Sequence, residues 1–160
     1  MTKADADTVP NAFFPSFEVL NPAVQSAPFV FSSPHSGRVY PPEFLAQSRL
    51  DPLTLRKSED CSVDRLFRSV ASLGAPLLSA RFPRAYLDVN REPYELDPVL
   101  FRDGLPHYAN TQSVRVIGGL GTIARIVSES DEIYREPLSV GAALERINRL
   151  YTPYHETLSN

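Results

Sequence analysis

The sequence contains little that would suit a secreted, membrane or nucleic-acid-binding protein. It has one cysteine, Cys61, in 160 residues, which excludes an internal disulfide framework and suits a reducing compartment. No apolar run approaches the roughly 20 residues that span a bilayer, and no apolar core of a signal peptide follows the N-terminus. Basic runs are absent and the net charge is −3, which argues against nucleic-acid binding. We therefore expect a soluble, cytoplasmic chain without nucleic-acid or membrane partners.

Two common catalytic signatures are also absent. An α/β-type serine hydrolase would show a Gly-x-Ser-x-Gly turn, and the sequence has none. The glycine-rich segment 118–122 lacks the lysine of a phosphate-binding loop and matches no dinucleotide fingerprint. Glycine is scarce, with 7 residues against 15 prolines. Because proline fixes one backbone dihedral, this ratio predicts ordered loops, which often carry functional side chains.

Apolar patterning predicts strands that alternate with helices. Strands are expected at 28–32, 76–80, 85–89 and 122–127, the first of them buried. Helices are expected at 41–47, at 63–70 with Ser58 or Asp60 as cap and Gly74 as stop, and at the C-terminus from Ser139 with a kink at Pro153. This alternation predicts an α/β fold with a partly parallel sheet.

The chain divides into two predicted parts. Residues 1–27 are polar and interrupted by prolines, so we expect an N-terminal arm with an ordered part around 17–20. Residues 28–160 carry the patterned elements. The chain ends two residues after an amphipathic helix, which in an α/β alternation normally leads into another strand. We therefore expect 28–160 to be the N-terminal part of a single domain, cut short at its C-terminal end.

Two residues are candidates for binding a metal ion. His35 follows a predicted strand, and ligands of open α/β sheets bind beyond the carboxyl ends of the strands. Neutral imidazole is a common zinc ligand, although His35 could instead hydrogen-bond a loop. Asp60 precedes a predicted helix, whose free N–H groups would keep its carboxylate ionised, as a ligand requires. The alternative is that Asp60 only caps this helix.

A second group of candidates is basic. Arg84 and Arg91 flank a predicted strand that ends at Asn90. Arginine binds carboxylates through two parallel hydrogen bonds, and asparagine adds a donor beside it. These residues could therefore anchor an acidic substrate, or they could pair with Asp88 and nearby glutamates. For three more residues a structural role is the alternative to a catalytic or ligand role: Cys61, His107 and His155.

Together these segments resemble the N-formylglutamate amidohydrolase family. The matching segments agree in order and spacing from about residue 28 to the C-terminus, and they are Ser33–Gly37, Glu59–Phe67, Ala80–Pro93, Gly121–Arg125, Ile133–Tyr134 and Tyr151–His155.

The resemblance implies a three-layer α/β/α fold with a mixed, mostly parallel sheet, similar to zinc carboxypeptidases. It implies one zinc ion bound by His35 and Asp60, with Glu59 a weaker choice than Asp60. It also implies that Asn90 and Arg91 bind the substrate carboxylate, helped by Arg84 or Arg125. Arg91 and Arg125 are the implied catalytic residues, and an arginine or the metal would stabilise the oxyanion. The implied reaction is hydrolysis of an N-acyl acidic amino acid, N-formylglutamate to formate and glutamate, by zinc-activated water.

The chain departs from this family in length. Members run about 100 residues longer, as a single α/β domain does. The additional part carries an Asp-x-His-Ser-like segment with a second zinc histidine, and an acidic residue that could act as base. We therefore expect the third ligand and the base beyond residue 160. Two alternatives stay open: another zinc amidase or carboxypeptidase-like enzyme, and an inactive module that binds an acidic ligand.

Overall fold

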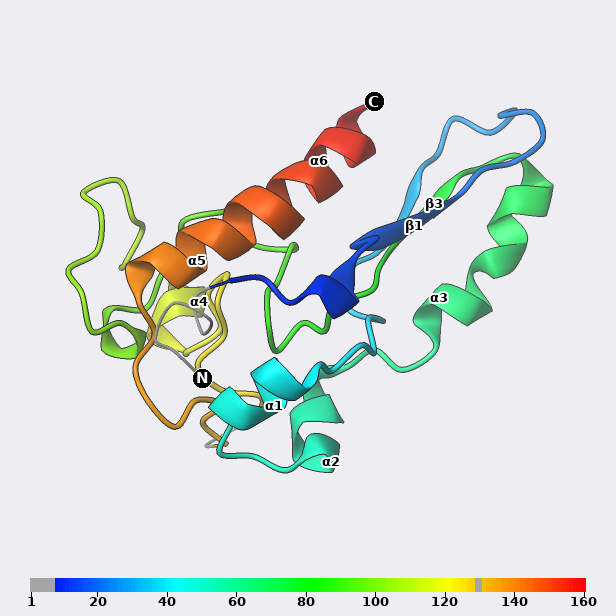
Figure 1. Ribbon diagram of the computed structural model, residues 1–160. Coiled ribbons are helices and arrows are strands. Elements are labelled where there is room, and N and C mark those ends of the chain that lie inside the picture. Colours follow the sequence, from blue (N-terminus) through cyan, green and yellow to red (C-terminus); the bar gives the residue numbers. More distant parts are fainter. Residues whose placement is uncertain (1–7, 129–130) are drawn as a thin grey trace.

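The described strands form one three-stranded mixed sheet. The computed structural model describes residues 8–128 and 131–160 (Figure 1). The strands β1 (Phe17–Leu20), β2 (Phe31–Ser33) and β3 (Leu77–Ala80) lie in the order β1-β3-β2. β1 pairs antiparallel to β3, and β2 pairs parallel to it. The sheet is therefore mixed, as predicted, with one of its two pairings parallel.

Helices cover both faces of this sheet. α3 (Val63–Leu66) and the 3₁₀-helix η3 (Arg68–Leu73) form the last part of the connection from β2 to β3, and Phe67 contacts Phe31 with a ring separation of 5.9 Å. The next residue of β2, Ser32, faces the other way and hydrogen-bonds Tyr154 of the last helix at 2.8 Å. Successive strand residues point to opposite faces, so the two helical segments lie on opposite sides of the sheet (Figure 1). The α/β class predicted from the sequence is confirmed.

The last helix is continuous but irregular. It consists of α5 (Val140–Arg146), the π-helical turn η5 (Ile147–Tyr151) and α6 (Thr152–Ser159). Ser139 caps it by accepting a hydrogen bond from the Ala142 N–H at 3.0 Å, as predicted. Pro153 lies in the first turn of α6, directly after the π-helical turn. A proline lacks an N–H donor, and the wider turn before it accommodates that loss.

The remaining elements are short helical turns in the loops that surround the core. They are η1 (Asn11–Phe13), α1 (Pro42–Gln47), α2 (Pro52–Leu55), η2 (Arg56–Ser58), η4 (Pro98–Leu100) and α4 (Val114–Ile117). Asp51, Asp97 and Ser113 cap three of them with side-chain hydrogen bonds. Among the described residues, no helix has the length and apolarity needed to cross a bilayer.

Aromatic rings fill much of the main core. Phe44 is fully buried, and its ring lies 5.1 Å from that of Tyr86 and 6.4 Å from that of Tyr134. Phe13, from the segment predicted as an arm, lies 4.7 Å from Tyr86 in the same cluster. Residues 1–7 of that segment lie outside the described residues. The division of the chain into domains stays a prediction.

A buried arginine crosses this core. Arg146 is 1% exposed, and its guanidinium lies 3.8 Å from the centre of the Tyr86 ring. It donates hydrogen bonds to the Tyr86 carbonyl at 3.0 Å and to the Tyr134 hydroxyl at 2.7 Å. A buried charge needs such partners to offset its desolvation. The last helix is thereby attached to the segment that carries Asp88.

Two predicted strands are wrong. Residues 85–89 are buried, but they form a turn, in which Tyr86 N–H bonds the Pro83 carbonyl and Asp88 N–H bonds the Thr122 carbonyl. Among the described residues, 122–127 make a single isolated bridge, between Ile126 and Glu132. A short apolar run indicates burial, and burial alone does not distinguish a strand from a packed loop.

Other predicted elements hold in part. Strand 76–80 is confirmed over Leu77–Ala80. Strand 28–32 begins only at Phe31, where pairing with Leu77 starts, and the preceding Phe29 and Val30 are 63% and 52% exposed rather than buried. Helix 63–70 is divided between α3 and η3, and it ends at Gly74, with φ of 84°, as predicted. Its N-cap is Ser62, without a side-chain hydrogen bond, so the predicted cap at Ser58 or Asp60 is wrong.

The core predicts a large effect for one truncation. Phe44→Ala removes a fully buried ring and leaves a cavity, so the free energy of unfolding should fall by about 3–5 kcal/mol. Leu53→Ala, at a side chain 79% exposed on α2, is the control and should change it by less than about 0.5 kcal/mol. Urea denaturation measures both, and similar values for the two variants would contradict the packing described.

Candidate functional site

The turn after β2 holds His35 in a fixed place. Ser33 and Ser36 join their hydroxyl groups at 2.6 Å across this turn. Gly37 lies so close to the neighbouring segment that a Cβ atom would stand 1.9 Å from the Phe82 carbonyl oxygen. Only glycine allows this approach of two backbones. The turn therefore packs directly on the backbone of the segment that leads to Asp88, and His35 is buried between them, 7% exposed.

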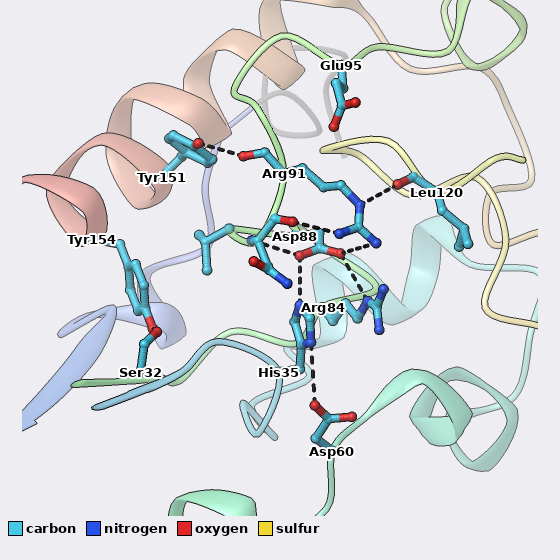
Figure 2. Close-up of polar contacts among 12 residues, drawn as sticks. Ser32, His35, Asp60, Arg84, Asp88, Arg91, Glu95, Leu120, Tyr151 and Tyr154 are labelled. Carbon is cyan, nitrogen blue, oxygen red and sulfur yellow. Dashed lines mark hydrogen bonds and ion pairs between the residues drawn. The ribbon is translucent and has the colours of Figure 1, made fainter. Parts of the chain in front are cut away.

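The imidazole of His35 has a carboxylate at each nitrogen (Figure 2). Nε2 lies 2.7 Å from Asp88 Oδ1, and Nδ1 lies 3.5 Å from Asp60 Oδ2. The Asp60 N–H also donates to the His35 carbonyl at 2.9 Å. The two carboxylates differ in environment, since the side chain of Asp88 is 2% exposed and that of Asp60 is 52% exposed. The Asp88 side of the imidazole is therefore closed, and the Asp60 side is the more open one.

Asp88 is the residue to which the other site residues connect. Its carboxylate accepts hydrogen bonds from Arg84 Nε at 3.0 Å and from the Asn90 N–H at 2.9 Å, and Arg91 Nη2 lies 3.4 Å away. Burial alone raises the pKa of this carboxyl. The hydrogen bond with His35 and the positive charges of Arg84 and Arg91 outweigh burial and hold the pKa of Asp88 below its ordinary value. Asp88 therefore stays ionised in the fold.

The two arginines of the site differ in how many donors they have left. The side chain of Arg91 is 7% exposed, and it donates hydrogen bonds to the Leu120 carbonyl at 2.9 Å and to the Asn90 carbonyl at 2.6 Å. Arg84 is 24% exposed and uses only Nε within the described structure. Both arginines pair with Asp88, which the sequence offered as the alternative to binding an acidic substrate. The terminal N–H groups of Arg84 are thus the more available for a ligand.

Three other residues lie outside this cluster or take another part in it. Arg125 binds Asp97 at 2.7 Å and Glu132 at 3.4 Å, and none of its contacts joins it to His35. The side chain of Glu59 is 2% exposed and pairs with Arg56 at 3.0 Å, so its carboxylate already has a partner. Asn90 is exposed and enters the cluster through its backbone. The structure therefore brings together His35, Asp60, Arg84, Asn90 and Arg91, but not Arg125.

The last helix supports the loop after Asp88. The Tyr151 hydroxyl donates to the Arg91 carbonyl at 2.6 Å, and His155 Nε2 lies 2.7 Å from the Val89 carbonyl oxygen. The rings of Tyr151 and His155 stack at 4.2 Å. Their spacing of four residues places both on one helix face, and the segment Tyr151–His155 is also one of those that carry the family resemblance. His155 is thus a support of the site backbone.

The described residues contain no group of three His, Cys, Asp or Glu side chains that could hold a metal ion. His35 and Asp60 are a pair whose donor atoms lie close enough to share one ion, within the 5 Å or so expected of two ligands. Asp88 is on the far side of the imidazole and cannot join them.

Comparison with known proteins gives a consistent result. The sequence model of the N-formylglutamate amidohydrolase family matches residues 27–160. The fold is similar to the crystal structure of N-formylglutamate amidohydrolase from Ralstonia eutropha JMP134, with a TM-score of 0.82, 36% sequence identity, and coverage of 90% of this chain and 50% of that one. The chain thus spans about half the length of this solved protein. No curated protein matches it.

The pairing at Asp88 predicts how stability depends on pH. Asp88→Asn leaves His35 and two arginines without their carboxylate, which should cost roughly 3–5 kcal/mol at neutral pH. Because the folded pKa of Asp88 is lowered, its contribution is complete above the unfolded value of about 4 and is lost as pH falls through the folded value.

Urea denaturation between pH 7 and pH 2 measures this difference. The difference in the free energy of unfolding between wild type and Asp88→Asn should therefore become smaller as the pH falls. The control Glu136→Gln, at an exposed residue, should have the stability of the wild type throughout. A gap that stays constant to pH 2 would show that the carboxylate charge does not stabilise the fold.

Proposed function

This chain belongs to the N-formylglutamate amidohydrolase family, and we propose that it forms the His35 side of a zinc-dependent amide hydrolase. The substrate proposed is N-formylglutamate or a closely related N-acyl acidic amino acid, and the products are formate and glutamate. The observation that carries this proposal is the imidazole of His35, with a buried carboxylate at one nitrogen and a half-exposed carboxylate at the other. A reducing, cytoplasmic setting is part of the same proposal and rests on the single cysteine.

The residues present suit zinc. A metal-binding histidine usually donates its second N–H to a carboxylate or carbonyl, which sets its tautomer. The 2.7 Å contact of His35 Nε2 with buried Asp88 supplies such an acceptor and leaves the lone pair of Nδ1 on the open side. Two ligands of a tetrahedral zinc with bonds near 2.0–2.1 Å stand about 3.4 Å apart. The separation of His35 Nδ1 and Asp60 Oδ2, 3.5 Å, fits that value.

The donor set is incomplete by one ligand. Catalytic zinc sites have three protein ligands and an open position for water, and the described residues offer His35 and Asp60. When bound, zinc lowers the pKa of a bound water toward about 7 and polarises the amide carbonyl. Asp88 keeps the imidazole in the ligand tautomer, and Gly37 and Ser36 keep the turn in place.

The arginines are proposed to bind and orient the substrate carboxylate. Arg84 and Arg91 both lie against Asp88 and supply positive charge that can pair with an anion. Arg84 has its terminal N–H groups available for a two-point hydrogen bond with a carboxylate. Arg91 and Asn90 lie on the same loop, which Tyr151 and His155 fix from behind. A substrate held in this way places its amide toward His35 and Asp60.

Zinc binding tests the metal part of this proposal. His35→Gln and Asp60→Asn should each weaken zinc binding by the chain at least about tenfold, and Asp88→Asn by about 10–100-fold through the lost support of the imidazole. His107→Gln, at a histidine outside the cluster, is the matched control. Isothermal titration with zinc at neutral pH measures these affinities. Binding that resists all three changes, or that depends on His107, would place the metal elsewhere and favour an inactive acidic-ligand-binding module.

Substrate profiles test the anchor. In the complete enzyme, Arg84→Ala should lower kcat/KM for N-formylglutamate. The loss of transition-state stabilisation should be about 2–4 kcal/mol, the scale for losing a charge-assisted hydrogen bond. Arg115→Ala, on the exposed face of α4, is the control. Two analogues of the substrate, each with one of its carboxylates replaced by an amide, identify the carboxylate that Arg84 binds. For the analogue that lacks this carboxylate, Arg84→Ala should leave kcat/KM unchanged. If Arg125→Ala has the larger effect instead, the anchor lies outside this cluster.

A further inference from the structure

A polar cavity lies beside the turn that follows β2. Its volume is about 200 Å³, which is the room of roughly six or seven water molecules at about 30 Å³ each. The polar and charged residues that line it are Glu18, Ser36, Arg38, Asp64, Ser79 and Arg81. His35, Asp60 and Asp88 do not line it. The cavity is therefore separate from the candidate zinc site, and it suits a small metabolite.

The pairing of β1 with β3 explains why charged side chains meet in this cavity. Glu18 stands opposite Ser79, and the Arg81 N–H continues the ladder to the Ser16 carbonyl at 3.0 Å. Successive strand residues point to opposite faces, so Glu18, Ser79 and Arg81 share one face of the sheet. Leu77, two residues before Ser79, lies on this face and packs against η3. The face is thus apolar under η3 and polar at the cavity.

One of the two charge pairs in the cavity is already made. Arg38 binds Asp64 of α3 through two hydrogen bonds of 3.2 and 2.6 Å. Arg81 instead donates to the Pro15 carbonyl at 3.0 Å, and no ion pair joins it to a carboxylate within the described part of the chain. The Glu18 carboxylate likewise has no partner among the described residues. The cavity therefore presents one carboxylate and one guanidinium that no side chain neutralises.

The spacing of these two charges suits a ligand that carries both signs. Side chains at diagonal positions of neighbouring strands have Cβ atoms about 7–8 Å apart, and Glu18 and Arg81 hold such positions. A guanidinium binds a carboxylate through two parallel hydrogen bonds, and an ammonium group donates to a carboxylate. A simple anion or cation would leave one of the two charges of the cavity without a partner.

We propose that this cavity binds a free α-amino acid with a small side chain. The ligand carboxylate pairs with Arg81 and the ligand ammonium group pairs with Glu18. The Ser79 hydroxyl, opposite Glu18 in the sheet, is a further hydrogen-bonding group. This site stands independently of the proposed zinc site and of the proposed amide hydrolysis.

An NMR titration of the ¹⁵N-labelled 160-residue chain with L-alanine tests the ligand class. The amide signals of Ser36, Gly37 and Ser79 should shift along a saturable curve at neutral pH. Propionate lacks the ammonium group and ethylamine lacks the carboxylate. Each should bind at least about tenfold more weakly, because it loses one charge-assisted contact. No saturable shift, or equal binding of either analogue, overturns the proposal without any need for a variant.

Three variants test where L-alanine binds. Glu18→Gln keeps the shape of an exposed side chain but removes its charge, so it should weaken binding at least about tenfold. Glu43→Gln, at an exposed residue outside the cavity, is the matched control and should bind as the wild type does. Arg84→Ala, in the proposed substrate site, should also bind as the wild type does. Undiminished binding by Glu18→Gln overturns the proposal. Loss of binding in Arg84→Ala would place L-alanine in the substrate site and overturn it as well.

Discussion

The buried carboxylate of Asp88 is the constraint on which the rest of the site depends. A charge that is 2% exposed is costly unless it is paired, and here His35, Arg84 and the Asn90 N–H bind it while Arg91 lies nearby. These partners come from two segments that are far apart in the sequence. The turn after β2 and the loop after residue 85 are therefore held together by one ionised group.

The surrounding structure keeps that carboxylate in place. Arg146, buried among Tyr86 and Tyr134, holds the backbone two residues before Asp88. Tyr151 and His155 hold the carbonyl groups that follow it. All three belong to the last helix, so one element controls both sides of Asp88. This explains why an irregular loop can support a site, although loops generally carry weaker backbone restraints than strands.

The site separates a closed side from an open side. His35 Nε2 contacts the buried Asp88, whereas Nδ1 faces the half-exposed Asp60, the side from which solvent and substrate can approach. The proposed zinc site follows from this asymmetry.

The sequence by itself determined the α/β class, the capped last helix with Ser139, the stop at Gly74 and the family, because each depends on local spacing or on motifs in order. It also identified His35 and Asp60 as a pair. Only the tertiary structure decided that 85–89 and 122–127 are packed loops, that Arg125 pairs with Asp97, and that Asp88 connects the site. His35 and Asp88 are 53 residues apart. Local patterns record burial and turns, whereas the pairing of distant charges depends on how the whole chain folds.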